Sequence, residues 1–453
     1  MGFLKRLWER LTAHPAAPSG ARSSPAPATA GMVRELLDPT FLRAQFERIH
    51  DQVGSPVPED EYQRALAELD ERQAALAAPQ ASAPRPDAAF MPRHPALSML
   101  QSLLETCIES RADELLRELE PGEKGFPTHA LVDPNLYEQF GPCDITWVQT
   151  KLAEAWQLLE GRPPFRDKPA DPVRVANNLR LIVVGDWGSG LPSAVNVGTQ
   201  MRAVVEDGRR SGRSQHVIHL GDVYYSGWAE EYDKRFLSYW PVRAGERDVG
   251  SWSLNGNHDM YSGGHGYFGH LLRDPRFAAQ QQSSYFSLEN DHWQILGLDT
   301  GYLDADLDGS QAAWVKNRLQ GSPAKALLLS HHQLLSSYNT GVGAKLEARL
   351  AEAFAVRPAD AWFWGHEHRC ALYQPAQHAR YPRCIGHGGI PAFVSAPNDP
   401  LPDGVQYEYR GARIDGSDRW QLFGFAVLDF DGPEITVRYI DELGDEHHRE
   451  SIV

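Results

Sequence analysis

Five short apolar segments of the chain each end in a glycine or serine that leads into Asp, Asn or His. The segments are LRLIVVGD (179–186), HVIHLGD (216–222), WSLNGNHD (252–259), KALLLSHH (325–332) and AWFWGHEH (361–368). A short apolar run bounded by glycine is typical of a buried strand that ends in a tight turn. Ligands bind at the carboxyl ends of the strands in open α/β sheets. We therefore expect the polar side chains of all five segments to converge on one edge of a sheet.

These side chains are carboxylate, amide and imidazole groups, which together suit Mn, Fe, Zn, Co or Mg. Two histidines spaced by one residue place both rings on the same side of an extended chain or turn. Because the set contains no cysteine, a structural zinc site is not expected. Two metal ions about 3.5–4 Å apart that share a carboxylate form the usual clamp for phosphoryl displacement. The candidate ligands are Asp186, Asp222, Asn257, His331 or His332, His366 and His368.

The motifs GDWG, GDVYY, GNHD, SHH and GHEH, in that order, resemble those of the calcineurin-like metallophosphoesterase superfamily over about residues 178–440. The resemblance implies two packed β-sheets flanked by helices, with a dinuclear metal site at the strand ends. Most of the superfamily has Asp-x-His as its first motif, and that histidine binds the first metal, whereas this chain has Gly188 there. Tyr225, three residues after Asp222, offers a substitute. This combination resembles the purple acid phosphatase branch, in which the tyrosine binds a ferric first metal.

The resemblance also implies a role for each motif residue. The first metal would take Asp186, Asp222, Tyr225 and His368, and the second would take Asp222 as a bridge together with Asn257, His331 and His366. The choice of His331 over His332 follows the family pattern, in which the first residue of the pair is the ligand. The implied cofactors are two metal ions, iron with a second iron, manganese or zinc. The alternative for Tyr225 is that both adjacent tyrosines pack beside the strand end and water completes the shell.

Three further histidines are candidates for contact with a substrate. His258 follows Asn257 directly, and in the family this histidine contacts the phosphate or protonates the leaving group. Imidazole suits that catalytic role because its pKa lies near neutral pH. His265 lies on a glycine-rich loop, which lines a pocket or is a plain surface loop. His387 lies on a second glycine-rich turn, RCIGHGGIP (383–391), and the resemblance places such a loop at the border of the site.

The elements that must position these residues begin near Arg180. From there, short apolar strands alternate with helix-like stretches at residues 191–210, 230–240, 310–320 and 344–355, which favours an α/β (α+β) fold. Trp187, Trp362 and Trp364 flank the motifs and are expected to pack in the core. The pattern predicts a metallophosphoesterase catalytic domain over residues 176–453.

The first part of the chain has a different composition and a mainly helical pattern. Residues 1–96 combine an amphipathic start, Pro- and Ala-rich linkers and a helical segment, and residues 97–175 form a helical accessory region. Apolar residues share one helical face with Lys and Arg at residues 3–11, as in a helix that touches an anionic membrane. The other interpretation is a helix that docks on this chain or on a protein partner, because only three turns are available.

The overall composition limits which classes of partner and which cellular compartment we expect. The 453 residues carry a formal net charge of −16, and an acidic surface repels nucleic acid, so general nucleic-acid binding is not expected. A small phosphorylated substrate fits, because bound metals reverse the local field. No apolar run reaches the ~20 residues of a membrane span, and the first residues lack a signal peptide's apolar core. We expect a cytoplasmic protein in which Cys370 and Cys384 are reduced buried thiols, a disulfide between them being the alternative.

The sequence thus predicts a metal-dependent hydrolase of phosphate esters with a dinuclear centre and a metal-bound hydroxide as nucleophile. The alternative enzyme is a phosphodiesterase that acts on cyclic nucleotides or other diesters, because both reactions use the same clamp. A third hypothesis is a non-catalytic scaffold with a degenerate phosphoesterase fold. The ligand set is complete once Tyr225 is included, which disfavours the scaffold.

Overall fold

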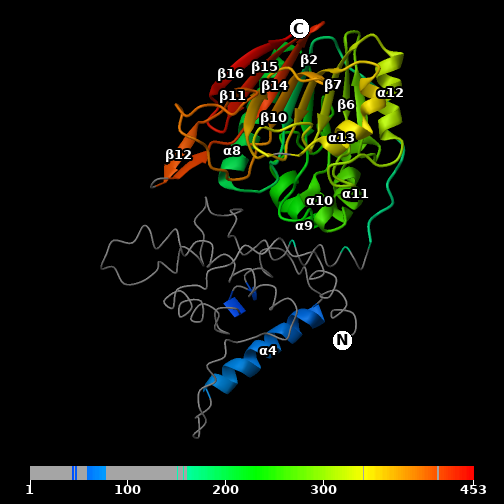
Figure 1. Cartoon of the computed structure of the whole chain (residues 1–453). Coiled ribbons are helices and arrows are strands. Elements are labelled where there is room, and N and C mark those ends of the chain that lie inside the picture. Colours follow the sequence, from blue (N-terminus) through cyan, green and yellow to red (C-terminus); the bar gives the residue numbers. More distant parts are fainter. Residues whose placement is uncertain are drawn as a thin grey trace. The chain divides into compact units, whose positions relative to one another are not determined.

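The computed structural model describes residues 43–44, 46–47, 59–77, 150, 157, 161–339, 341–415 and 418–453 (Figure 1). The chain divides into two units, Met1–Leu159 and Glu160–Val453, and each is described by itself. Within the described residues, no helix is both long and apolar enough to cross a membrane. The amphipathic segment at residues 3–11 lies outside the described residues, so its contact with a membrane or a partner stays a prediction.

The main described element of the first unit is the helix α4, Glu59–Ala77, which confirms the helical spacing of this segment. Tyr62, Ala65 and Leu69 are buried at intervals of three and four residues, so they lie on one face of the helix. The ring of Phe46 stacks on Tyr62, with the ring centroids 5.4 Å apart. The described part of this unit carries no side-chain cluster of the kind that binds metals.

Two β-sheets form the centre of the second unit. One has eight strands in the order β1-β5-β6-β7-β8-β10-β9-β11 and the other has six in the order β16-β15-β14-β2-β3-β4. The strands of the first are β1 Val173–Arg174, β5 Phe286–Glu289, β6 Trp293–Gly297, β7 Lys325–Ser330, β8 Ala359–Trp364, β9 Cys370–Tyr373, β10 Ala379–Ile385 and β11 Val405–Glu408. Those of the second are β2 Leu179–Val184, β3 Ser214–His219, β4 Val249–Ser253, β14 Gly424–Asp431, β15 Glu434–Asp441 and β16 Glu446–Ile452. A separate pair is formed by β12 Ala412–Asp415 and β13 Asp418–Gln421.

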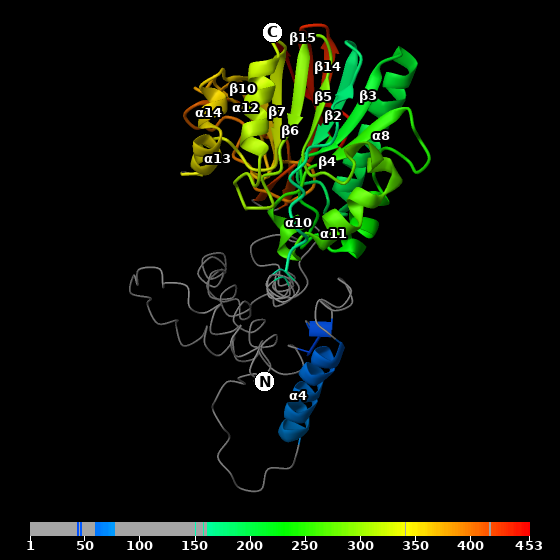
Figure 2. The ribbon, with the colours of Figure 1, turned by 90° about the vertical axis from the view of Figure 1, so that its right-hand side faces the viewer.

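Helices cover the outer face of each sheet, which confirms the predicted architecture of packed sheets flanked by helices (Figure 2). The helix α8 packs beside β2, β3 and β14, and α12, α13 and α14 pack beside the eight-stranded sheet. Short helices lie near the strand ends. The helices are α8 Pro192–Ser211, α9 Ala229–Glu231, η2 Tyr232–Leu237, α10 Asn257–Tyr261, α11 His265–Gly269, η3 Leu271–Arg273, η4 Pro275–Gln280, α12 Gln311–Gly321, α13 Ala344–Arg349 and α14 Ala351–Phe354.

The alternation of side chains along each strand explains the layers. Successive residues of a strand point to opposite faces, so a run that is apolar throughout is buried on both. In β7, Leu327 and Leu329 join the core between the two sheets, whereas Leu328 joins the core under α12, α13 and α14. The tryptophans Trp362 and Trp364 lie in the same outer core, as the sequence predicted.

Parallel pairing places the polar segments together. The strands β2, β3 and β4 run parallel to one another in one sheet, and β7, β8 and β10 do so in the other. Their carboxyl ends therefore lie at one edge of each sheet. Asp186 comes two residues after β2, His331 directly after β7, and His366 two residues after β8. The five segments singled out in the sequence thus end at the same side of the sandwich.

Candidate metal centre

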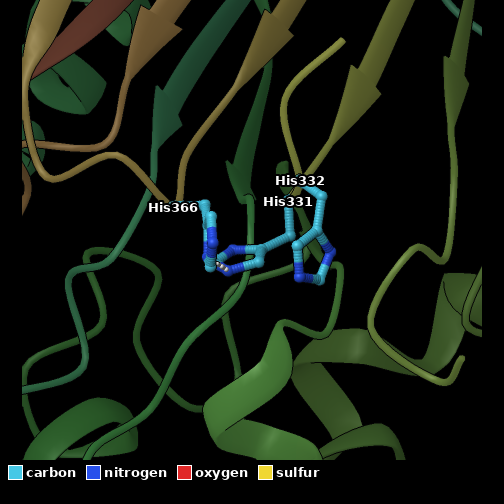
Figure 3. A group of neighbouring side chains, drawn as sticks. All are labelled: His331, His332 and His366. Atoms are coloured by element: carbon cyan, nitrogen blue, oxygen red, sulfur yellow. Dashed lines mark hydrogen bonds between the residues drawn. The ribbon is translucent and has the colours of Figure 1, made fainter. Parts of the chain in front are cut away.

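The first group of candidate ligands surrounds Nε2 of His331. This nitrogen lies 3.1 Å from Oδ1 of Asn257, 3.2 Å from Nδ1 of His366 and 3.4 Å from Oδ2 of Asp222. In Figure 3, the dashed line joins Nε2 of His331 to Nδ1 of His366. Metal–ligand bonds of about 2.0–2.2 Å leave the ligand atoms of one ion roughly 3–3.5 Å apart. The spacing of this group fits one metal ion.

The backbone and a tyrosine orient two of these ligands. Nδ1 of His331 lies 3.1 Å from the carbonyl oxygen of Leu220, so the proton of a neutral ring sits on Nδ1 and the lone pair of Nε2 faces the group. The amide nitrogen of Asn257 donates to the hydroxyl of Tyr261 at 2.8 Å, which turns its Oδ1 toward His331. Burial disfavours a charged His331, but the Asp222 carboxylate outweighs it and raises the pKa of His331 to about 9. The carboxylates thus favour a positive charge at this position.

The second group surrounds the hydroxyl of Tyr224. It lies 3.0 Å from Oδ1 of Asp186, 3.2 Å from Oδ2 of Asp222 and 3.1 Å from Nε2 of His368. His368 and Asp186 are themselves 3.5 Å apart through the same two atoms. These distances also fit the ligands of one ion. Oδ2 of Asp222 belongs to both groups, and this is the position that the sequence assigned to a bridging carboxylate.

The tyrosine of this group is Tyr224, not the predicted Tyr225. The ring of Tyr225 lies instead against Arg235, whose guanidinium carbon is 5.2 Å from the ring centroid. The physical reason is the backbone at Gly188, which forms a β-bridge with Val223 and accepts a hydrogen bond from the N–H of Tyr224 at 3.0 Å. This bridge fixes the chain so that the side chain directly after Val223 reaches Asp186. The same bridge leaves no room for a histidine, since a Cβ at Gly188 would lie 2.7 Å from Cγ2 of Val223.

Four of the candidate ligands have a left-handed backbone, which is rare for residues other than glycine. The φ angles are 56° at Asp186, 74° at Asp222, 67° at His366 and 45° at His368. Each such conformation costs about 1–2 kcal/mol, and strain of this kind clusters at functional sites. Hydrogen bonds hold it in place: the N–H of His366, for example, donates to Oδ2 of Asp186 at 2.7 Å.

Glycines explain how these turns come so close together. A Cβ at Gly365 would lie 2.5 Å from Oδ2 of Asp186, and one at Gly256 would overlap Oδ1 of Asp222. Gly365 and Gly256 must therefore be glycines, because the carboxylates of Asp186 and Asp222 lie directly against their Cα atoms. In the motifs GNHD and GHEH, the glycine is therefore needed for close packing and the residue after it supplies the candidate ligand.

Two buried carboxylates that the sequence reasoning did not single out support the turns. Asp259 accepts hydrogen bonds from the N–H groups of Asp222, Val223 and Gly256 at 2.8, 3.1 and 2.7 Å. Burial, together with the nearby Asp222 carboxylate, raises the pKa of Asp259. Its place at the end of GNHD was the available signal. Glu231 accepts from the N–H groups that follow Tyr224, among them Ser226 at 3.0 Å, and no motif marks it.

His258 lies beside the shared carboxylate, where the sequence placed it. Its backbone N–H donates to Oδ1 of Asp222 at 2.9 Å, and its Nε2 is 4.0 Å from Oδ2 of the same residue. Nδ1 lies 2.7 Å from the carbonyl oxygen of Tyr225, so Nδ1 carries a proton and Nε2 is the nitrogen directed toward Asp222. Burial lowers the pKa of His258, and Asp222 opposes that effect. Its role in proton transfer or phosphate contact stays a prediction.

Of the other predicted histidines, His332 lies beside the first ligand group, whereas His265 and His387 lie apart from both groups. His332 offers a ring nitrogen within 4.8 Å of the ligand atoms of His331 and His366 (Figure 3). Its Nδ1 lies 3.0 Å from the hydroxyl of Thr300 and its Nε2 lies 3.4 Å from Oδ1 of Asp304, and these contacts favour His331 as the ligand. His265 is exposed, and its Nε2 lies 3.1 Å from the carbonyl oxygen of Gly161. His387 is fully buried beside Cys370, so its surroundings do not support the predicted substrate contact.

Two smaller expectations are also answered. Trp187 is buried and its Nε1 donates to the carbonyl oxygen of Ala194 at 2.7 Å, which confirms it as a core residue. Cys370 and Cys384 are free and buried, so the expectation of two reduced thiols is confirmed over a disulfide.

Comparison with known proteins shows which family and which solved structures the chain is similar to. Residues 179–370 match the family model of the calcineurin-like phosphoesterases, and this span contains all five motifs. No curated protein sequence matches the chain. Among solved structures, the chain is similar to GAP50, the anchor in the inner membrane complex of Plasmodium, with 12% identity, a TM-score of 0.45, and coverage of 60% of this chain and 88% of that one.

Two further solved structures are similar over the same share of the chain. One is a predicted phosphoesterase from Streptococcus pneumoniae, with 11% identity, a TM-score of 0.27, and coverage of 60% of this chain and 95% of that one. The other is Vps29 from Entamoeba histolytica in complex with Zn²⁺, with 13% identity, a TM-score of 0.25, and coverage of 60% and 98%.

Proposed function

We propose that this chain, which carries a calcineurin-like phosphoesterase domain at residues 179–370, is a hydrolase of phosphate esters that uses two metal ions. The observation that carries the proposal is the shared oxygen of Asp222. Oδ2 lies 3.4 Å from Nε2 of His331 in one ligand group and 3.2 Å from the Tyr224 hydroxyl in the other. A carboxylate oxygen that belongs to two groups brings two cations close together, and such a pair is the clamp for in-line phosphoryl displacement.

The two groups differ in charge, and the difference favours two different ions. The group around Tyr224 contains the carboxylates of Asp186 and Asp222 and a phenol that can ionise. The group around His331 contributes neutral imidazole and amide donors besides the shared carboxylate. Oxygen anions suit a small, highly charged ion, whereas imidazole suits a divalent transition metal. We infer ferric iron in the first group and iron, manganese or zinc in the second, as in the purple acid phosphatase branch that the sequence resembles.

Bound metals would supply charge that stabilises the phosphoryl oxygens and lowers the pKa of a bound water. The chain itself positions the ester and moves the proton. The side chain of His368 is 29% exposed while those of Asp186, Asp222 and His331 are at most 1% exposed, so a substrate approaches from the His368 side. Nε2 of His258, on the ring beside Asp222, would hold or give up the proton of the leaving alcohol.

The alternative substrate class is a diester, cyclic nucleotides included, because the same clamp serves both reactions. The experiment is a metal analysis of the purified protein coupled to turnover of 4-nitrophenyl phosphate and of its bis ester. We expect two metal ions per chain that are lost, together with turnover, in Asp222→Asn, and a clear preference for one of the two esters. A metal-loaded protein that hydrolyses neither ester nor a cyclic nucleotide would instead favour the non-catalytic scaffold.

A further inference from the structure

A third cluster of metal-competent side chains lies outside the two groups described above. It consists of Cys370, His387 and His447, which each offer one ligand atom, and these three atoms lie within 4.8 Å of one another. Cys370 begins β9 and His387 comes two residues after β10, both in the eight-stranded sheet, whereas His447 belongs to β16 of the six-stranded sheet. The cluster therefore spans the two sheets at the ends of three separate elements.

The burial of this cluster leaves its nitrogen atoms unsatisfied. Cys370 and His387 are fully buried, and within the described residues neither ring nitrogen of His387 makes a hydrogen bond of good geometry, the backbone of Ile385 being the one polar group that acts on this ring. Nε2 of His447 is likewise buried without a partner in this part of the chain. A buried polar group without a partner costs about 1–3 kcal/mol, so native proteins rarely retain several together. Each neutral ring has one nitrogen with a lone pair, so one nitrogen of His387 and Nε2 of His447, beside one thiol, point to a ligand that accepts these two lone pairs.

The surroundings hold the two rings in place. Nδ1 of His447 lies 2.9 Å from the hydroxyl of Tyr407, and its ring stacks on Tyr409 with the centroids 3.6 Å apart. A proton on Nδ1 then leaves the lone pair on Nε2, and a hydrogen bond of this kind is what fixes the tautomer of metal-binding histidines. Gly424 makes room for the other ring, since a Cβ there would lie 2.6 Å from Nε2 of His387.

We propose that Cys370, His387 and His447 bind a divalent metal ion of the zinc class, with water as the fourth ligand. One thiolate and two imidazoles are ligands that zinc prefers. Bonds of about 2.3 Å to sulfur and about 2.0–2.1 Å to nitrogen place the ligand atoms roughly 3.3–3.7 Å apart, so the three side chains would close by about an ångström around the ion. Binding would release the thiol proton of Cys370 to solvent.

This ion would act on the catalytic edge through the turn that contains His387. The N–H of Gly388 donates to the carbonyl oxygen of Gly185 at 3.1 Å, and a Cβ at Gly386 would lie 2.8 Å from Oδ2 of Asp186. The backbone on both sides of His387 thus packs against the turn that presents Asp186. A metal that ties His387 to β9 and β16 would fix this turn and join the two sheets beside the candidate phosphoesterase centre.

The experiment uses the thiolate as a reporter. The full-length protein is stripped with a chelator and reloaded with Co²⁺, and its near-ultraviolet absorption is recorded. Thiolate-to-cobalt charge transfer distinguishes this cluster from the ligand groups around His331 and Tyr224, because those groups contain no cysteine. We expect the band in the wild-type protein and its loss in Cys370→Ser, together with loss of one zinc ion per chain after reloading with Zn²⁺.

Matched variants separate this site from other sources of the signal. Cys384 lies on the neighbouring strand β10 but belongs to the outer core, so Cys384→Ser should keep the band. The double variant Cys107→Ser/Cys143→Ser should keep it too. Asp222→Asn should also keep it while losing the metals of the candidate phosphoesterase centre, so the two proposals fail separately.

Two results would overturn the proposal. One is a wild-type protein that binds Co²⁺ without any thiolate band, which needs no variant and so stands even where Cys370→Ser does not fold. The other is a band that survives Cys370→Ser and disappears in Cys384→Ser. Either result would leave the cluster as a buried contact between the sheets that holds no metal.

Discussion

The hydroxyl of Tyr224 lies 3.0 Å from Oδ1 of Asp186, and the two side chains come from turns after neighbouring parallel strands. Between these turns, Gly188 and Val223 form a β-bridge that excludes any side chain at position 188. The phenol thus occupies space that a histidine at position 188 could not reach without moving Val223. We propose that the Tyr224 hydroxyl serves as the ligand that Gly188 cannot supply.

The first prediction concerns the colour of the iron-loaded protein. Burial raises the pKa of Tyr224 well above 10, and Asp186 and Asp222 raise it further, so only a strongly acidic cation would ionise this phenol. Ferric iron would do so and give a visible phenolate-to-iron charge-transfer band. We expect Tyr224→Phe to abolish the band and Tyr225→Phe, the matched control, to keep it. Absorption spectra of the oxidised proteins check this.

The opposite outcome has a clear meaning. A band that is lost in Tyr225→Phe and kept in Tyr224→Phe would restore the three-residue offset from Asp222 that the sequence predicted. An active iron-loaded protein without any band would show that neither tyrosine binds the metal, and that water completes the first ion's shell.

The second prediction compares the shared carboxylate with its support. Asp222→Asn removes the charge that both ligand groups use, so we expect loss of both ions and of nearly all turnover. Asp259→Asn keeps the ligands but weakens the acceptor for the N–H groups of Asp222, Val223 and Gly256. Partners of this kind typically contribute 10–100-fold to metal affinity. We therefore expect about a 10–100-fold weaker metal affinity, with turnover that recovers at saturating metal.

Metal titrations followed by turnover measurements distinguish the two variants. Asp259→Asn acts through Asp222, so added metal should rescue it, whereas added metal should not rescue Asp222→Asn. Normal metal content in Asp222→Asn would remove this residue from the bridge.

The strand ends could be predicted from the sequence because a strand, its glycine and its polar residue are contiguous along the chain. Which of two adjacent tyrosines turns inward could not be predicted in this way, because the bridge between Gly188 and Val223 sets it from a distant turn. Glu231 acts by accepting backbone N–H groups, and no motif marks that role, whereas the only signal for Asp259 is its place at the end of GNHD. The burial of His387 depends on β14, about 40 residues later in the chain, where Gly424 approaches its ring.

The third prediction concerns where the second unit begins. The sequence predicted residue 176, but residues 161–175 pack on this unit: Phe165 stacks on Tyr285 at 5.9 Å, and Asp167 accepts from the N–H of Ser310 at 2.7 Å. The short strand β1 also pairs with β5. We expect a variant that begins at residue 160 to fold and retain activity, and one that begins at 176 to melt several degrees lower. Thermal unfolding of the two variants measures the difference. Equal melting temperatures would show that the contacts of residues 161–175 do not stabilise this unit.

The last prediction concerns His258. Its backbone N–H bonds to Oδ1 of Asp222, but its side chain is held by the carbonyl oxygen of Tyr225 and is not needed to hold a metal in either ligand group. We therefore expect His258→Ala to keep both metal ions and to slow turnover by about 10²–10⁴-fold, the usual contribution of a positioned acid or base. If Nε2 protonates the leaving alcohol, the loss should be large for phenyl phosphate and small for 4-nitrophenyl phosphate, whose leaving group needs little protonation.

His332→Ala is the matched control, since His332 lies near His366 but contacts Thr300 and Asp304. An equal loss for the two esters in His258→Ala would assign His258 to binding the phosphate, and a loss of metal would make it a support of Asp222.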